Sequence, residues 1–161
     1  MRTRIPYKTL TAPEEPNVHL TRHTDNALRC LTFLALNPGQ AVTAGQVAQR
    51  MRMSPDHLNK VIARLSDLGY VETQRGRLGG VRLAKPASRI RVGRVVRDTE
   101  ESFALVECFT PETNQCPIAP ACTLASTLDR ALKAFLAVLD DVTIADLVEQ
   151  PRRLQRLLEA S

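Results

Sequence analysis

Residues 43–65 contain two short amphipathic segments separated by a single tight turn, and this pairing constrains the fold more than any other feature of the sequence. Thr43 precedes the first segment and Ser54 the second, and both residue types cap helix N-termini by accepting a backbone hydrogen bond. Pro55 then occupies the first helical position, where a helix needs no N–H. Apolar residues recur every three or four positions in both segments, so we predict two helices packed on one core.

The second of these predicted helices has an outward polar face. Two helices joined by a tight turn form the helix-turn-helix motif, in which the second helix enters the major groove of DNA. Polar side chains on that face are therefore the candidates for contacting base edges and phosphates. The candidates are Ser54, His57, Asn59, Lys60 and Arg64.

The hydrophobic period then changes from helical to strand-like. Residues 70–73 and 81–83 alternate as strands do, and the segment between them, 74–80, is rich in glycine and arginine. The pattern predicts a two-stranded hairpin, or wing, directly after the helix-turn-helix. Glycines let the backbone approach a phosphate closely, and Arg75 and Arg77 could enter a minor groove or clamp phosphates. An ordinary solvated hairpin is the alternative.

Helical spacing is present on both sides of this unit. It begins at Thr24 and stops at an Asn-Pro-Gly turn, returns over residues 90–101, runs for about five turns over residues 124–139, and starts once more at 143–149. Residues 102–123 show no such period and are predicted to form an irregular loop. We therefore predict a mainly α protein, a winged helix-turn-helix domain with a two-stranded wing followed by a long C-terminal helix.

The long C-terminal helix has an apolar stripe with spacings of three and four residues. A domain of this size cannot easily cover such a stripe alone, so we expect a second copy of the chain to cover it and interpret this element as a dimerisation helix. Packing within one chain is the alternative. The stripe consists of Leu124, Leu128, Ala131, Leu132, Phe135, Val138 and Leu139.

Charge is divided unevenly along the chain, which has a formal net charge of +5. Residues 1–97 contain 17 Lys or Arg and 6 Asp or Glu, which is +11, whereas residues 98–161 contain 5 and 11, which is −6. Basic side chains that displace counterions from phosphates supply most of the non-specific affinity for DNA. The basic part therefore favours double-stranded DNA as the partner, with a solvated surface as the alternative.

Three of the four cysteines lie close together in the sequence. Seven residues separate Cys108 from Cys116 and five separate Cys116 from Cys122, whereas Cys30 stands alone in the first predicted helix. An odd cluster disfavours disulfides, and three thiolates on one loop can hold a metal centre. Zinc sites more often have cysteines two to four residues apart, so the spacing slightly favours an iron-sulfur cluster over zinc. Cys30 is expected to be a small core residue.

Five pieces of the sequence resemble a known family. They are similar to the winged-helix iron-sulfur regulators of the NsrR and IscR type, and within that family to its nitric-oxide-sensing branch, over residues 18–150. The pieces are Leu-Thr-Arg-His-Thr-Asp at 20–25, Leu-Gly-Tyr-Val-Glu-Thr at 68–73, Arg-Gly-Arg-Leu-Gly-Gly at 75–80, Leu-Val-Glu-Cys-Phe at 105–109 and Thr-Ile-Ala-Asp-Leu-Val at 143–148.

The resemblance implies a homodimeric transcription repressor that releases a palindromic operator when nitric oxide attacks its cluster. It also implies that three loop cysteines of one subunit bind a [4Fe-4S] or [2Fe-2S] cluster. An aspartate near the start of the first helix of the other subunit completes the coordination, and the matching position here is Asp25. His19 and His23 are weaker candidates for this ligand because neither matches the implied position. The first cysteine interval is longer than in some relatives, which leaves the cluster type open.

The predicted organisation has four parts: a flexible extension over residues 1–17, the winged helix-turn-helix domain over 18–101, the cysteine loop over 102–123, and the dimerisation helix and C-terminal tail over 124–161. We find neither a signal peptide nor an apolar run long enough to span a bilayer, so we expect a cytoplasmic protein without membrane contact. No nucleophile, histidine and acid have catalytic spacing, so we do not expect an enzyme.

Two other functions stay open. A regulator of iron-sulfur cluster assembly or iron homeostasis would have the same fold and respond to a different signal. A zinc-binding or electron-transfer protein without a DNA role would leave the helix-turn-helix, the wing and the basic part of the chain unexplained.

Overall fold

The computed structural model describes residues 19–74, 76 and 79–160. The predicted extension at 1–17 lies outside the described residues, as do Arg75 and Arg77 of the predicted wing tip.

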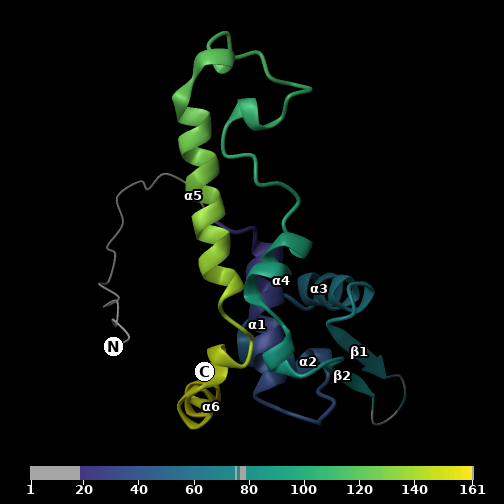
Figure 1. The fold of residues 1–161 in the computed structure, drawn as a ribbon. Helices are drawn as coiled ribbons and strands as arrows, with labels where there is room; N and C mark the ends of the chain where they lie inside the picture. Colours follow the sequence, from purple (N-terminus) through teal and green to yellow (C-terminus); the bar gives the residue numbers. More distant parts are fainter. Residues whose placement is uncertain (1–18, 75, 77–78, 161) are drawn as a thin grey trace, which may run out of the picture.

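The described chain is mainly helical and carries one two-stranded sheet (Figure 1). Short 3₁₀ turns at Ala87–Arg89, Glu107–Phe109, Ala119–Ala121 and Asp146–Val148 connect the longer elements. The longer elements are α1 (Arg22–Ala35), α2 (Ala44–Met51), α3 (Pro55–Asp67), β1 (Val71–Gln74), β2 (Gly80–Leu83), α4 (Val92–Thr99), α5 (Thr123–Asp140) and α6 (Pro151–Glu159).

Helix α1 lies at the centre of the core and contacts α2, α3, α4 and β2. Its residues Ala27, Cys30 and Leu31 are fully buried, and they pack with the buried faces of the neighbouring helices. Removing this apolar surface from water is the main favourable contribution to folding of the body that α1 to α4 and the two strands form.

The helix N-termini follow the predicted capping chemistry with one shift. Thr43 and Gln46 form a reciprocal capping box at α2. Ser54 stands at the N-cap of α3, although its side chain makes no capping hydrogen bond. Helix α1 begins at Arg22 instead of Thr24, because the Thr21 hydroxyl caps it while the Thr24 side chain is buried.

The wing is an antiparallel pair in which Val71 lies opposite Leu83 and Gln74 opposite Gly80. Val42, in the loop before α2, forms an isolated antiparallel β-bridge with Val81 of β2. Two backbone hydrogen bonds, of 2.8 and 3.0 Å, join the two residues. A Cβ on Gly80 would lie 2.7 Å from the Val42 carbonyl oxygen, so glycine allows this close approach. Strand β2 of the wing is thereby tied, near the turn of the hairpin, to the loop before α2.

Helix α4 packs tightly against the C-terminal end of α5. Arg97 donates to both carboxylate oxygens of Asp140, at 2.6 and 2.7 Å. The chain following α5 then pairs with the chain before α4, because Val92 N–H donates to the Val142 carbonyl and Ile144 N–H donates to the Ile90 carbonyl. The start of the long helix, by contrast, projects beyond the body together with the cysteine loop (Figure 1).

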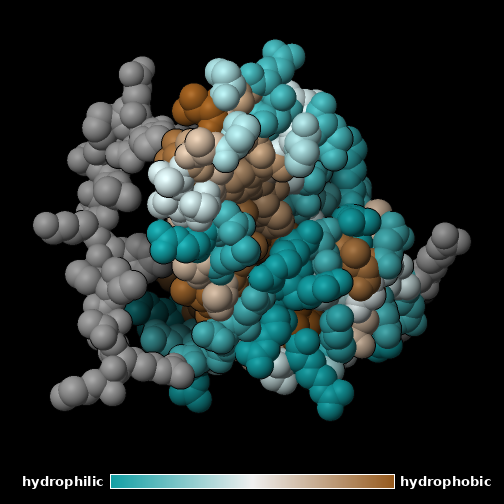
Figure 2. Space-filling model, turned by 45° about the horizontal axis from the view of Figure 1, so that its top comes forward, coloured by the Kyte–Doolittle hydropathy of each residue, from teal (hydrophilic) through white to brown (hydrophobic). Residues whose placement is uncertain are grey.

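The apolar stripe of α5 is divided between two faces, and packing within the chain covers one of them. One face is half-buried, and its Leu136 and Leu139 pack against the core of the same chain. On the other face Leu124, Phe135 and Val138 remain 57, 46 and 66% exposed. Figure 2, turned so that the loop end comes forward, shows apolar side chains gathered in a band bordered by hydrophilic ones.

The C-terminal segment differs from the prediction. The expected helix at 143–149 is only a 3₁₀ turn, Asp146–Val148, and it is followed by the unpredicted helix α6. Pro151 explains the break, because a proline disfavours helical geometry in the residue before it, and Gln150 has φ −116° and ψ 63°. Among the described residues, no helix has the length and apolar character needed to cross a membrane.

Replacing Gly93 by Ala should destabilise the protein by about 1–2 kcal/mol. A Cβ there would lie 2.8 Å from the Asp140 backbone nitrogen and even closer to its carboxylate. The overpacking cost of roughly 1–3 kcal/mol exceeds the gain of about 1 kcal/mol or less from helix propensity. Urea unfolding checks the shift in midpoint.

Gly45→Ala is the matched control. Gly45 lies in α2, and a Cβ there would meet only the Thr43 hydroxyl, at 3.9 Å. Helix propensity then acts alone, and the midpoint should stay the same or rise. Equal effects of the two substitutions would contradict the close approach of α4 and α5.

Candidate DNA interface and metal centre

Helix α3 presents the predicted polar face to solvent. Its apolar residues are buried against α1 and α2, which leaves the other side of the helix open. Ser54, His57, Asn59 and Lys60 are all exposed. This arrangement suits a helix that enters a major groove, where hydrogen-bonding side chains must reach base edges and phosphates.

Arg64 is placed differently from the other four candidates. Its guanidinium donates to the backbone carbonyl of Asp98 at the end of α4, at 3.0 Å. The side chain is still exposed, but this contact holds it against the body of the protein instead of directing it outward. Arg64 therefore joins α3 to α4, and a DNA contact by this side chain remains only a prediction.

The start of α1 lies beside α3, a placement that the sequence interpretation did not predict. Arg22, His23 and Asn26 line a shallow hollow together with His57 and Lys60 of α3. The hollow places basic and polar groups of two helices beside each other, next to the groove-reading face. No sequence period marks this juxtaposition, because it depends on how α1 packs against α3.

Asp25 lies on the exposed side of the first turn of α1. Its carboxylate pairs with Arg29 at 3.5 Å, and the Asp25 side chain is 59% exposed. Thr21 caps the helix instead, and the Thr21 N–H and hydroxyl in turn donate to Glu100 at 2.8 and 3.2 Å. The Asp25 carboxylate is thus not used as a helix cap and stays accessible to a group from outside the chain.

The cysteine loop is irregular, as predicted, and is shaped by its own polar groups. The Glu107 carboxylate accepts a hydrogen bond from the Gln115 N–H at 2.6 Å, and the Asn114 side chain accepts one from the Cys116 N–H at 3.0 Å. Cys108, Cys116 and Cys122 are free thiols and half-buried.

The donor set has the chemistry that an iron-sulfur cluster needs, since thiolates are its usual ligands. Among the described residues, however, no group of three or more His, Cys, Asp or Glu side chains is arranged to hold a metal ion. The loop projects from the start of α5, away from the core around α1 (Figure 1). The three thiols are therefore the right kind of ligand for an iron-sulfur cluster. To surround a cluster, the loop would have to bring them closer together, and a further donor would have to be added.

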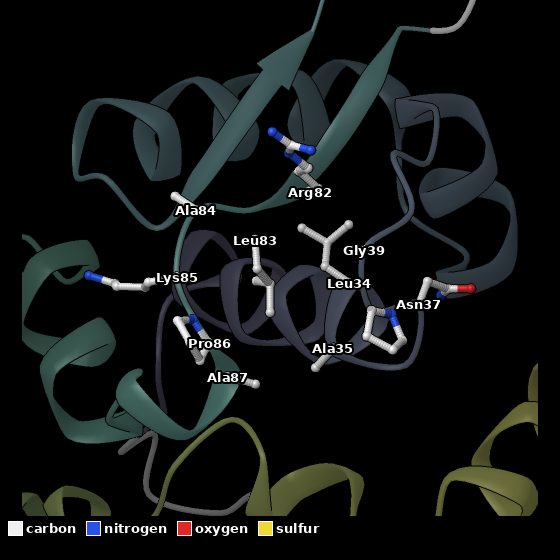
Figure 3. A pocket seen from close by; sticks show the side chains of 11 residues that line it. Leu34, Ala35, Asn37, Gly39, Arg82, Leu83, Ala84, Lys85, Pro86 and Ala87 are labelled. Carbon is white, nitrogen blue, oxygen red and sulfur yellow. The ribbon is translucent and has the colours of Figure 1, made fainter.

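Cys30 is chemically distinct from the loop cysteines. It is fully buried in α1, and burial raises the pKa of its thiol to about 12. Since the thiolate is the form that binds metals, Cys30 is a core residue with no place in a cluster site. A separate hollow between the end of α1 and β2, lined by residues such as Leu34 and Leu83, likewise contains none of the predicted site residues (Figure 3).

These features define a winged helix-turn-helix DNA-binding protein that carries a cysteine loop beside a long helix. The profile of the Rrf2 family, described as an iron-dependent transcriptional regulator, matches residues 20–150. The chain belongs to the Rrf2 family. It is a DNA-binding transcriptional regulator and not an enzyme, as the sequence predicted.

Curated relatives are similar over nearly their whole length. The transcriptional regulator NsrR of Bacillus subtilis (strain 168) is 48% identical over 141 residues, which cover 87% of this chain and 97% of the relative. NsrR of Geobacillus kaustophilus (strain HTA426) is 46% identical over 143 residues, covering 88% and 97%. The resemblance to regulators named NsrR is thereby confirmed.

Solved structures confirm the predicted fold. IscR of T. potens superimposes with a TM-score of 0.67 at 25% identity, covering 83% of this chain and 88% of that one. CymR of Staphylococcus aureus in its oxidised form gives a TM-score of 0.65 at 23% identity, covering 81% and 96%. The second likeness concerns the fold alone.

Alkylation of the native, metal-free protein at mildly alkaline pH should label the three loop cysteines and spare Cys30. The loop thiols are half-buried, whereas Cys30 has no exposed surface and a raised pKa. Mass spectrometry of the digested protein gives the labelled positions. Unfolding in denaturant should expose Cys30 to the reagent. Fast labelling of Cys30 in the native state would contradict its place in the core.

Proposed function

We propose that this protein is a homodimeric repressor whose iron-sulfur cluster senses nitric oxide. In this proposal Cys108, Cys116 and Cys122 of one subunit hold the cluster, and Asp25 of the partner subunit completes its coordination. The observation that carries the proposal is the set of three free thiols on one projecting loop, in a chain nearly half identical to regulators named NsrR. Genes for nitric oxide detoxification are the expected targets.

The exposed carboxylate of Asp25 supports its assigned role. A cross-subunit ligand must be accessible and must not be needed for a local contact, and Thr21 already caps α1. The pair with Arg29 is half-exposed and easily exchanged, because surface ion pairs contribute about 0–1 kcal/mol. When bound, the cluster would supply iron to which nitric oxide can bind in place of a protein ligand. Loss of Asp25 from the cluster would break this link between the two subunits.

Dimerisation through α5 completes the arrangement. Leu124, Ala131 and Val138 follow one another at intervals of seven, and Phe135 lies between the last two, which is the spacing of a coiled-coil seam. This face is exposed in the single chain, so a second copy of α5 is its natural cover. A two-fold dimer presents two recognition helices, which read half-sites about 34 Å apart in successive major grooves of a palindromic operator.

A regulator of iron-sulfur assembly or iron homeostasis is the second candidate. The similarity to T. potens IscR and the iron-dependent description of the family favour it. The two candidates differ in the signal, because a nitric oxide sensor releases DNA when exposed to the gas while iron supply stays constant. A zinc-binding or electron-transfer protein without a DNA role no longer agrees with the family.

Substituting any one loop cysteine by Ala should abolish both the visible absorption of anaerobically purified protein and tight operator binding. Asp25→Ala should have an intermediate effect, since water or a thiol replaces a carboxylate more readily than a cluster loses a thiolate. Anaerobic absorption spectra, iron and sulfide contents and DNA-binding titrations give the result. Nitric oxide should bleach the wild-type protein and release the operator over the same range of doses.

Cys30→Ala is the matched control, because it removes a thiol that lies in the core. It should keep both colour and DNA binding, at some cost in stability. Colourless wild-type protein with one zinc per chain and no response to nitric oxide would overturn the sensor proposal.

Replacing Phe135 and Val138 together by Asp should convert the dimer into monomers. Two unpaired carboxylates from each subunit would then face the apolar seam, where charge without a partner is strongly unfavourable. Analytical ultracentrifugation measures the mass. Ala137→Asp is the control, because Ala137 is also exposed but lies on another side of the same helix. A well-folded dimer in the double variant would place the interface elsewhere.

A further inference from the structure

One acidic residue at the end of α4 holds both DNA-reading elements. The Asp98 carboxylate accepts a hydrogen bond from the Tyr70 hydroxyl at 2.7 Å, and Tyr70 directly precedes the first strand of the wing. The Asp98 backbone carbonyl accepts the bond from Arg64 of the recognition helix α3 at 3.0 Å. The carboxylate is only 17% exposed, and Arg94 pairs with it at 3.0 Å. Asp98 thus joins the wing base and α3 to α4.

The same short helix is fixed to α5 on its other side. The next residue toward the N-terminus, Arg97, forms the two-pronged contact with Asp140, and Gly93 allows the backbones to approach. Hydrogen bonding with Arg97 lowers the pKa of the Asp140 carboxyl, and this pair is therefore ionised at neutral pH. Within eight residues, α4 contacts α5, Arg64 of α3 and Tyr70 at the base of the wing.

We propose that α4 acts as a splint that sets the angle of the recognition helix and wing relative to the dimerisation helix, with Tyr70, Arg97 and Asp98 as positioning residues for operator binding. The inference rests on the proposed α5 dimer and is independent of the cluster. None of these residues needs to touch DNA. Their effect is geometric, through α3 and the wing.

The geometry of a two-fold dimer makes such a splint effective. Each recognition helix lies about 17 Å from the axis, half of the spacing between successive major grooves. Two-fold symmetry would repeat any rotation between α4 and α5 in both subunits, so that the separation and the relative orientation of the two recognition helices both change. Small changes at the Arg97–Asp140 contact therefore change which half-site spacing fits.

The test compares Tyr70→Phe and Arg97→Gln with the control Lys133→Gln. The first substitution removes only a hydroxyl, the second removes the contact between α4 and α5, and the control removes an exposed ion pair with Asp129 within α5. Partly exposed ion pairs contribute little to stability, and in Tyr70→Phe the Asp98 carboxylate keeps its pair with Arg94. All three variants should therefore fold as dimers. Sedimentation and circular dichroism check this.

The probes are a palindromic duplex selected from a random library by the wild-type protein, the same duplex with one base pair added or removed at its centre, and a single half-site. One base pair rotates the half-sites by about 35°. Dissociation constants come from fluorescence anisotropy at fixed salt, since affinity for DNA depends strongly on salt.

Wild type and Lys133→Gln should prefer the selected spacing strongly. In Tyr70→Phe and Arg97→Gln we expect binding to the selected duplex to weaken by roughly three- to tenfold. Binding to the shifted duplexes and the half-site should change little, so that discrimination of spacing falls.

If Tyr70→Phe and Arg97→Gln both discriminate between half-site spacings as strongly as the wild type, the splint proposal is wrong. An equal loss on the half-site would overturn it too, because the damage would then be local to α3. If the α5 substitutions Phe135→Asp and Val138→Asp leave a dimer, the dimer proposal fails and the splint with it. If they give monomers while the positioning variants behave as wild type, the splint alone fails.

Discussion

The close approach of α4 to the end of α5 is the constraint on which the rest of the arrangement depends. It needs a residue without a side chain at Gly93, and it places Arg97 against Asp140. The backbone pairing of Ile90 and Val92 with the segment after α5 then anchors the long helix in the core, where Ile144 is fully buried. Within the described part of the chain, these contacts anchor the C-terminal end of α5, while its opposite end and the cysteine loop project from the body (Figure 1).

This anchoring separates a basic part of the molecule from an acidic part. The body built around α1 carries most of the basic side chains and presents the polar face of α3, whereas the part after residue 97 carries an excess of acid. A positive body is attracted to phosphates, and an acidic arm is repelled by them. The charge distribution therefore favours one orientation on DNA, with the reading face toward the duplex and the cysteine loop away from it.

The cysteine loop supplies the thiols of the proposed site, but a single chain does not complete that site. Its thiols are free and half-buried, and its backbone is held locally by Glu107 and Asn114. A single chain does not gather the donors into a coordination shell within the described residues. In the proposed switch, a ligand shared between subunits would make the geometry of the dimer depend on the state of the centre.

Local patterns in the sequence determined the helix-turn-helix, the wing, the irregular loop and the long helix, because periodicity, capping residues and glycine-rich turns act over a few neighbouring positions. The family followed from short motifs spread over the same elements. Only the tertiary structure decided features that involve distant residues. Glu100 binds the cap residue Thr21 across 79 positions, Asp98 holds Arg64 and Tyr70, and the core covers one face of the α5 stripe and leaves the other open. Such contacts leave no period in the sequence, since they depend on which surfaces the packed helices bring together.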